Sequence, residues 1–584
     1  MWEEKREKVE LDLKKKLPVL IEVKEKAIIN GDHPNHILIE GDNLHALSTL
    51  SFTHAGKIDV IYIDPPYNTG ARDWKYNNDY VDSEDPYKHS KWISMMNKRL
   101  KLARNLLNET GIIIIAIDNY ELFTLGMLGD EIFYENNRIG VVAVRNNPPG
   151  RSISKYFATS HEYYLFYAKN KKNVIIYNIP NKKFNVNDYP FQDAVSHYRR
   201  KSLSMRGHSS LEDRPGNYFP IYFNPKKNTI TLEKESESDL FVLPHIQKNG
   251  KQRVWDYPKD SIQKLIDNND IEIVEEKKGK FKLCKKDRAT KGIIPKSLWT
   301  DAKYDSSAYG AVLLKNIFNN NKLFDYPKSL YAVIDAITVS SEKKHNTYIL
   351  DFFAGSGTTL HATMQLNAED GGTRQCILVT NNENNIAEEV CYERNKRVIN
   401  GYSKPNGEKV EGLKNNNLRY FKTEFVPGNR SEKNKRLLTS CSTALLQIKE
   451  DCYTDITEQA GFKEDLCCIS TNGKGKYLII VYHSRKQKET SIKLCEYINH
   501  ISDLSKKVRL YSFCYDLDLL LLDFEEAKER IDAAPLPGAI YKAYKKIFKV
   551  LDLDEKKVTE NQVKEKKSVN EKENELFKAT KVKK

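Results

Sequence analysis

Nearly continuous apolar segments alternate with amphipathic ones over the first 145 residues of the chain. "HILIEGDNLHALSTL" predicts a strand at 37–39, a break at 41–43 and a helix whose leucines share one face. "KIDVIYID" predicts a buried strand ending at Asp64, and "GIIIIAIDNYE" a second one ending at Asp118, with the amphipathic "SKWISMMNKRLKLARNLL" between them. Buried strands alternating with helices are typical of parallel strands covered on both faces, so the pattern predicts a doubly wound α/β fold.

The alternation stops near residue 145 and returns after residue 320. Stretches between them, such as "EDRPGNYFPIYFNPKKNTITLEKE", lack helical periodicity and predict strands and loops. "YILDFFAGSGTTLHATMQLN" then repeats strand, turn and helix. The predicted organisation is a solvated N-terminal helical extension (1–30), two halves of the α/β domain (31–145 and 321–430), an insertion (146–320), a small C-terminal α/β domain (431–550) and a charged tail (551–584).

Composition and charge narrow the class of partner. The chain has 584 residues, of which 40% are hydrophobic and 30% charged, and its net charge of +14 favours a polyanion such as nucleic acid. Nine cysteines without a C-x-x-C pair indicate neither a zinc site nor a disulfide framework, and we expect no metal. Because the N-terminus is charged and no run reaches about 18 apolar residues, we expect a cytoplasmic protein without membrane contact.

The segment "DFFAGSGTT" is a candidate cofactor loop. A strand that ends at Asp351, followed by the small residues 354–357 and a helix, permits the close backbone approach that a nucleotide cofactor requires. The spacing departs from G-x-G-x-x-G, and the Lys-Ser/Thr of a phosphate-binding loop is absent from it. A tight strand-to-helix turn without any ligand therefore remains the alternative.

The segment "IYIDPPYNTG" is the candidate catalytic loop. It closes another strand of the same pattern, and parallel strands present their carboxyl ends at one edge, so both loops can line one crevice. Asp64 can accept a hydrogen bond from an exocyclic amino group, Pro65 and Pro66 stiffen the loop and leave carbonyls free, and Tyr67 offers a ring for stacking a base. These groups predict a pocket for an extruded adenine whose nitrogen attacks an electrophilic methyl group.

Two other segments imitate parts of such a site. Asn147-Pro148-Pro149-Gly150 imitates a catalytic tetrapeptide, but glycine cannot stack a base, so we predict a loop. Asp118 also ends a strand at the predicted edge. It could help to order the site, although capping of the following helix is the favoured interpretation.

Taken together, D-P-P-Y and F-x-G-x-G resemble the amino-methyltransferases of nucleic acids that use S-adenosylmethionine. The catalytic tetrapeptide precedes the cofactor loop, which is similar to the permuted β class. "EGDNLHAL", "SHEYYLFYAKN", "LFDYPKSL", "DFFAGSGTTLHA" and "LRYFKTEF" further resemble the modification (Mod) subunits of type III restriction-modification systems. The resemblance implies a Rossmann-like class I methyltransferase fold with an inserted target recognition domain, and N6-adenine methylation of DNA.

The resemblance also implies roles for individual residues. Asp64, Pro65, Pro66 and Tyr67 would bind the target and transfer the methyl group. Residues expected at the cofactor are Asp42, Asn43, Asp64, Phe324, Lys328, Ser329, Asp351, Phe353, Ala354, Gly355, Ser356, Gly357, Thr358 and Glu383. Two of these keep an alternative. Lys328 could pair with the carboxylate of the cofactor or simply begin a helix, and the spacing of Glu383 is long for a bond to the ribose hydroxyls.

The insertion is the predicted DNA-binding part. A target adenine must leave the duplex, at a cost of a few kcal/mol, while something holds the DNA. The basic residues Arg199, Arg200, Lys201 and Arg206 are of the types that contact phosphates and base edges, although for any single arginine a solvated surface charge is favoured over base contact.

Several functions remain open from the sequence. The favoured hypothesis is a homodimeric modification and recognition subunit that binds double-stranded DNA and works with a separate restriction (helicase-nuclease) subunit. An orphan adenine methyltransferase, a cytosine-N4 or RNA methyltransferase, and a recognition module without transfer activity are the alternatives. Aspartate before Pro-Pro-Tyr favours adenine over cytosine.

Overall fold

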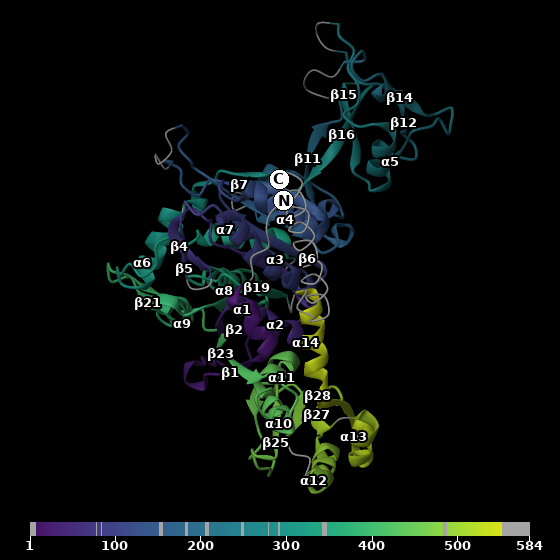
Figure 1. Cartoon of the computed structure of the whole chain (residues 1–584). Helices are drawn as coiled ribbons and strands as arrows, with labels where there is room; N and C mark the ends of the chain where they lie inside the picture. Colours follow the sequence, from purple (N-terminus) through teal and green to yellow (C-terminus); the bar gives the residue numbers. More distant parts are fainter. Residues whose placement is uncertain are drawn as a thin grey trace, which may run out of the picture. The chain divides into compact units, whose positions relative to one another are not determined.

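The computed structural model describes residues 7–551 except 77–78, 83, 151–155, 181–184, 205–209, 247–249, 278, 290–291, 342–346, 483–486 and 515. The chain divides into a larger unit, Met1–Tyr177 with Pro295–Lys584, and a smaller one, Asn178–Ile294. The larger unit is built on a ten-stranded sheet, shown in Figure 1.

Six parallel strands form the centre of this sheet, in the order β23-β2-β20-β19-β3-β6. Their bounds are Asn417–Pro427 (β23), Asn35–Glu40 (β2), Gln375–Thr380 (β20), Tyr348–Asp351 (β19), Ile58–Ile63 (β3) and Leu107–Ile117 (β6). On the β6 side follow β8 (Glu162–Ala168) and β7 (Arg138–Val144), each antiparallel to its predecessor, and then β18 (Leu298–Trp299), parallel to β7. The continuous apolar runs predicted as strands are buried on both faces, as a doubly wound sheet requires.

Helices cover both faces of the parallel strands (Figure 1). Alternate residues of β3, Ile61 and Ile63, belong to one core with the helices α2 (Asn43–Thr53) and α3 (Lys88–Leu106). Helix α7 (Leu330–Ser340) packs on β3, and helix α8 (Thr358–Asp370) packs on β20. These two helices also contact each other. The predicted α/β class is confirmed by this arrangement. Among the described residues, no helix combines the length and apolarity needed to cross a bilayer.

The N-terminal segment differs from the prediction of a solvated helix over 1–30. Helix α1 covers only Lys8–Lys15, and β1 (Lys16–Glu22) forms the edge strand, antiparallel to β23. The apolar residues 17–20 are buried there. Glu10 of α1 is buried as well, in an ion pair with Lys98 of α3. Pairing with a strand about 400 positions away overrode the local helical pattern.

The smaller unit contains a four-stranded sheet, a three-stranded sheet and the helix α5 (Lys259–Asp267). The first sheet has the order β10 (Phe191–Gln192), β11 (His197–Ser202), β16 (Lys280–Arg288) and β15 (Ile271–Lys277); the second has β13 (Thr229–Thr231), β12 (Ile221–Asn224) and β14 (Leu240–Val242). Trp255, Ile262 and Leu283 are central to its core. This unit is narrower than the insertion expected at 146–320, because β8 and β18 belong to the large sheet.

The C-terminal part has a sheet of its own, in the order β24 (Thr454–Asp455), β25 (Cys467–Thr471), β26 (Tyr477–Val481), β27 (Val508–Cys514) and β28 (Ile531–Pro537). The helices α12 (Gln487–His500) and α13 (Leu517–Asp523) accompany it. Helix α14 (Gly538–Val550) leaves this sheet and packs on α2 (Figure 1). The Tyr544 hydroxyl on α14 donates a hydrogen bond to the carbonyl of Pro18 in β1.

Candidate active site

Two loops meet at the carboxyl ends of neighbouring strands. β3 and β19 are parallel neighbours, with Ile61 opposite Leu350. Asp64 and Phe353 each come three residues after this pair, so the two predicted loops begin at the same height. The order of strands therefore brings together segments nearly 290 positions apart in the sequence, as the prediction of one shared edge requires.

The catalytic loop is fixed by α3 and by the start of the next helix. The indole nitrogen of Trp92 donates a 2.7 Å hydrogen bond to the carbonyl of Pro66. Asn68, in the left-handed region with φ of +59°, donates from Nδ2 to Glu121 Oε1 at 2.5 Å. His89 Nδ1 lies 2.6 Å from the same oxygen of the buried Glu121. These bonds hold the loop in one conformation, which explains how the costly Pro-Pro strand ending is tolerated.

A charge cluster surrounds Asp64 and Tyr67. Lys328 Nζ lies 3.1 Å from Asp64 Oδ1 and 2.7 Å from Glu162 Oε2, and it also contacts the hydroxyl of Tyr67. Tyr67 donates its hydroxyl proton to Glu162 Oε2 at 3.0 Å, and Asn146 Nδ2 reaches the same oxygen at 2.7 Å. Asp64 Oδ1, by contrast, is buried and accepts no hydrogen bond with good geometry from any described residue. Its ion pair with Lys328 leaves this acceptor available.

Burial and neighbouring charges shift the titration of the cluster. Burial raises the pKa of Asp64, the ammonium of Lys328 lowers it and the charge of Glu162 raises it, and the net shift is upward. For Lys328, burial alone would lower the pKa, but the charges of Asp64 and Glu162 outweigh burial and raise it. Burial also raises the pKa of Tyr67 well above its ordinary value, so its hydroxyl remains protonated. Lys328 is thus the charged group that favours an ionised Asp64, and the hydroxyl of Tyr67 adds to its effect.

The glycine turn is ordered from within by Asp351. One carboxylate oxygen accepts the backbone N–H of Phe353 at 3.0 Å, and the other accepts the hydroxyl of Thr359 at 2.6 Å. Burial raises the pKa of Asp351 to about 7. Both oxygens are therefore occupied by the turn itself, so this residue shapes the loop instead of reaching out of it.

Glycine is required at two positions of this turn. Gly355 has a φ of +49° and lies against the ring of Phe324; Gly357 has a φ of +74° at the start of α8. A Cβ on Gly357 would lie 2.4 Å from the amide nitrogen of Asn395, so no larger residue fits there. The fully buried Arg394 donates to the hydroxyls of Ser356 and Thr358 at 3.0 and 2.7 Å. The turn is therefore a rigid cradle, in which Ala354, Ser356 and Gly357 are buried and Gly355 is partly exposed.

The other residues expected at the cofactor are less uniform. Asp42 caps α2 by accepting the N–H of Leu44 at 2.8 Å, and Asn43 donates to the carbonyl of Phe352 at 3.0 Å, which ties α2 to the glycine turn. The hydroxyl of Ser329 is buried and donates to the carbonyl of Lys303 at 2.7 Å, a structural use. Glu383 follows β20 on a short 3-10 helix and is exposed.

The predicted DNA-binding residues lie on β11 of the smaller unit, except Arg206, which lies outside the described residues. Arg199 and Lys201 pair with Asp287 at 2.7 and 2.8 Å, and Arg200 is bidentate on Glu272. Each is an exposed charge whose acidic partner stands on β16 or β15 of the same sheet. Contact with phosphates would have to compete with these pairs.

Sequence reasoning missed Glu162 and Asn146. Glu162 lies in the segment "SHEYYLFYAKN" and Asn146 directly precedes the Asn147–Gly150 segment, but a lone acid and a lone amide carry no signal until the sheet places them beside Tyr67. The Asn147–Gly150 segment is a turn, with the N–H of Gly150 bonded to the carbonyl of Asn147 at 2.9 Å. Asp118 accepts the N–H of Tyr120 at 2.9 Å, in the turn before α4 (Leu122–Gly129).

A parallel sheet with a glycine cradle after one strand and an acidic, proline-stiffened loop after its neighbour defines an α/β methyltransferase. Residues 58–405, more than half of the chain, match the model of the DNA methylase family, and the chain belongs to this family.

Curated relatives agree with this membership. The chain is 35% identical over 362 residues to a type II methyltransferase, M.KpnI of Klebsiella pneumoniae, covering 62% of this chain and 84% of that one. It is 31% identical over 379 residues to the EcoPI Mod subunit of Escherichia phage P1, covering 60% of this chain and 58% of that subunit. The resemblance to type III Mod subunits is thereby confirmed, although the chain spans little more than half of their length.

Solved structures match with lower similarity. A putative DNA modification methylase from Thermus thermophilus, solved with S-adenosyl-L-methionine, is 12% identical, with a TM-score of 0.30, over 65% of this chain and 98% of that one.

Proposed function

We propose that this chain transfers a methyl group from S-adenosylmethionine to N6 of an adenine flipped out of duplex DNA. The observation that carries the proposal is the carboxylate of Asp64, whose buried oxygen Oδ1 has the ammonium of Lys328 3.1 Å away but no hydrogen bond of good geometry from a described residue. Because buried acceptors are usually hydrogen-bonded, an exocyclic amino group of a base is suited to supply a well-aligned donor to this oxygen. Asp64 is three residues from Tyr67 in the same loop and level with the glycine cradle, which supports that use.

The cradle fits an S-adenosylmethionine molecule. The partly exposed Gly355 permits close backbone contact, while Gly357 lets the turn pack closely on Asn395 and so fixes its shape. Phe324 and Phe353 flank the turn with aromatic surface. Backbone groups of residues 353–358, the side chain of Asp42 and the exposed carboxylate of Glu383 are the polar groups that would hold the cofactor, with Glu383 on the ribose hydroxyls. When bound, S-adenosylmethionine supplies an electrophilic methyl group.

The residues of the catalytic loop then act by position and charge. The carboxylate of Asp64 and a carbonyl of the Pro65-Pro66 segment accept the two amino hydrogens, which directs the nitrogen lone pair toward the cradle. The ring of Tyr67 stacks on the base while its hydroxyl is held by Glu162. Because no strong base is needed, orientation and preorganised charge provide the acceleration.

The smaller unit is proposed as the target recognition domain. Flipping a base costs a few kcal/mol, which contacts to the neighbouring DNA must offset. Arg199, Arg200 and Lys201 are basic side chains on one exposed strand, and phosphates could replace their acidic partners there. Arg206 is included in this proposal on the basis of the sequence alone, because it lies outside the described residues.

We propose that the chain is the modification and recognition subunit of a type III system, with a restriction subunit as partner and a second copy of itself as a dimer. Support comes from the curated Mod relatives from phage P1 and Salmonella typhimurium, at 31% and 29% identity. One observation favours a second candidate, a methyltransferase that works without a restriction subunit: the type II enzyme of Klebsiella pneumoniae is more similar and is matched over 84% of its length.

The test is transfer from labelled S-adenosylmethionine to unmethylated bacterial DNA, followed by digestion and identification of the modified nucleoside. N6-methyladenine is expected, and Asp64→Ala should abolish transfer while cofactor affinity stays within about twofold, since Asp64 lies outside the cradle. N4-methylcytosine, label in RNA alone, or transfer by Asp64→Ala at the parental rate would each refute the proposal.

A further inference from the structure

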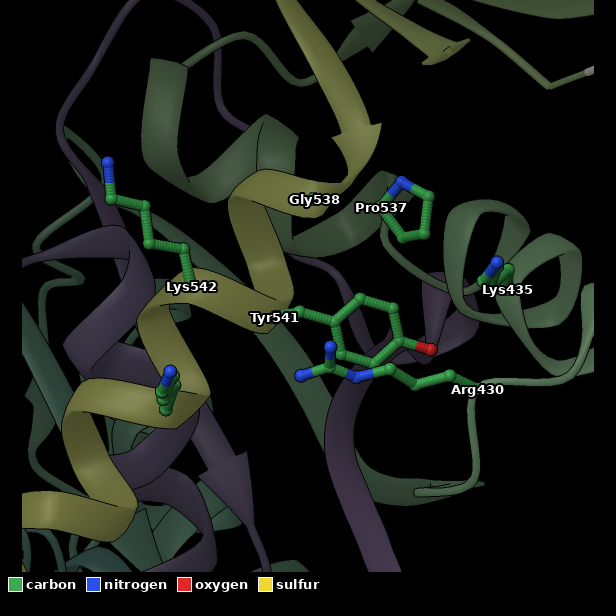
Figure 2. Close-up of a pocket in the computed structure, with 7 residues that line it drawn as sticks. Arg430, Lys435, Pro537, Gly538, Tyr541 and Lys542 are labelled. Atoms are coloured by element: carbon green, nitrogen blue, oxygen red, sulfur yellow. The ribbon is translucent and has the colours of Figure 1, made fainter. Parts of the chain in front are cut away.

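A basic pocket lies at the junction of the large sheet and the C-terminal part, distant in sequence from the catalytic loop (Figure 2). It has a volume of about 440 Å³ and is lined by Arg430, Lys435, Lys542 and Lys545, with Tyr541 and the first residues of α14. Figure 2 shows the side chain of Arg430 along the ring of Tyr541, whose centroid is 4.8 Å from the guanidinium carbon. No acidic residue lines this pocket among the residues that the structure describes.

The chain is arranged to keep these charges at the surface. Helix α14 buries Ile540, Tyr544 and Ile547 at spacings of three and four, while Lys542 and Lys545 on its other side are exposed. The helix contains four lysines and no acid. Among the four lining cations, an acidic partner is present only for Lys435, which pairs with Glu432 at 2.9 Å within the described structure.

The helix end adds to the same charge. Pro537 stands at the N-cap position, and no side chain of a described residue caps the first amides of α14. Unsatisfied amides and the positive end of the helix dipole favour an anion at this place. Like-charged side chains with no counter-charge, next to a helix N-terminus, are unfavourable unless an anion is nearby.

The position of the pocket relates it to the catalytic loop. Arg430 comes three residues after the end of β23, and β23 is parallel to β3, so both chain ends leave at the same edge of the sheet. β23 stands four strands from β3, a lateral offset of roughly 19 Å at about 4.8 Å per strand. Arg430 also lies eight residues beyond Lys422, which pairs with the last residue of β2, so this offset is a lower bound that corresponds to about six base pairs at roughly 3.4 Å each.

We infer that this pocket binds a backbone phosphate of the DNA substrate, a few base pairs from the flipped base. The inference rests on DNA as the substrate and not on the choice of adenine. Arg430 and the α14 lysines supply charge-assisted hydrogen bonds to the phosphate oxygens. A contact of this kind carries no sequence information, and it would hold the duplex whichever sequence the rest of the chain selects.

The test compares DNA binding by the full chain and by the triple variant Arg430→Gln/Lys542→Gln/Lys545→Gln. Affinity for an unmethylated duplex is measured between about 50 and 200 mM salt, and each lost phosphate contact lowers the salt slope by about 0.9. Over this range the parental affinity should fall about 3.5-fold more than that of the variant, because one phosphate contact is lost. Arg430→Lys keeps the charge and should retain nearly the parental slope.

The matched control is Lys493→Gln/Lys506→Gln/Lys507→Gln, which removes three exposed lysines of the same part of the chain that do not line the pocket. Circular dichroism and cofactor affinity verify folding of every variant. An unchanged slope in the pocket variant, or an equal loss in the control, refutes the inference. Binding of poly-glutamate is measured in parallel. The inference is also refuted if the pocket variant loses affinity for poly-glutamate but not for DNA, because the pocket would then be assigned to an acidic protein segment. Methyl transfer by the pocket variant, measured at saturating DNA, tests the proposed function separately, because weak DNA binding no longer limits the rate under this condition.

Discussion

Replacing Lys328 by Met should move the pH dependence of methyl transfer. Lys328 is the cation shared by two carboxylates, with side-chain exposures of 11% for Lys328, 2% for Glu162 and 26% for Asp64. Methionine fills a similar volume but carries no charge. Removing one partner of a buried ion pair costs about 3–5 kcal/mol, because the remaining charge is uncompensated.

The direction of the pH effect follows from the charges around Asp64. Burial raises the pKa of Asp64, and Lys328 is the charged neighbour that lowers it most. Without Lys328, this pKa rises further, so Asp64 becomes protonated at higher pH and can no longer accept the amino proton of the base. The acid limb of kcat/KM should therefore shift to higher pH, with about a tenfold loss of rate for each pKa unit, at pH values below that limb.

The assay is kcat/KM across the acid and alkaline sides of neutrality for the parental enzyme and the variant. A suitable control is Arg374→Met, which breaks a buried ion pair with Asp370, 2.8 Å away. Asp370 is the last residue of α8, at the end of this helix that is remote from the glycine turn. Both variants should lower the thermal midpoint, but only Lys328→Met should move the acid limb. An unshifted limb in Lys328→Met would refute the electrostatic role of this residue, and a shift in both variants would assign the effect to lost stability.

Two further predictions concern the glycine turn. Gly357→Ala should weaken S-adenosylmethionine binding by more than about tenfold in calorimetry, because its Cβ would press on Asn395. The control is Gly371→Ala, at the other end of α8, where φ is +72° and the space around the glycine is open. This control should cost only about 1–2 kcal/mol of stability and leave the affinity for S-adenosylmethionine intact. Equal affinities would contradict the cradle. Asp351→Asn should remove a pH dependence of stability. With a folded pKa of about 7 against an ordinary 3.8, Asp351 holds its proton more tightly when folded, so the stability of the parental protein should fall by up to about 4 kcal/mol as the pH rises from about 4 to about 7. The thermal midpoint of the variant should fall less over the same pH range. An equal fall of the thermal midpoint in the parental protein and in the variant would contradict this role of Asp351.

The sequence predicted those parts of the molecule that depend on neighbours along the chain. The strands at 37–39 and 58–63 follow from continuous apolar runs, and the two loops follow from residue types directly after such strands. What it could not predict depends on pairing across the fold. Whether 16–22 becomes a helix or a strand is decided by β23, and whether Arg200 is free to contact DNA is decided by Glu272, which lies 72 positions away on a neighbouring part of its sheet.

The charge cluster shows the same limit inside the site. Lys328 was expected either at the cofactor or as a helix-start residue, and its partner Glu162 was not singled out at all. The two lie 166 positions apart and meet because β8 joins the large sheet antiparallel to β6. No local pattern encodes this meeting, since a strand and its neighbour can be paired in either direction with the same apolar residues.

The place of the smaller unit in the strand order separates it from the two loops of the candidate active site. The chain leaves for the smaller unit after β8 and returns just before β18, and these strands belong to the end of the sheet, beyond the six parallel strands. At its start and end the smaller unit is closed on itself by β9 (Ile179–Pro180) paired with β17 (Gly292–Ile293). Because β3 and β19 lie inside the parallel core, the distance between their loops is fixed by the register of Ile61 with Leu350 and not by the length or sequence of the insertion. On the proposal that the smaller unit is the target recognition domain, a change in it would alter which DNA is bound while Asp64 stays level with the glycine turn.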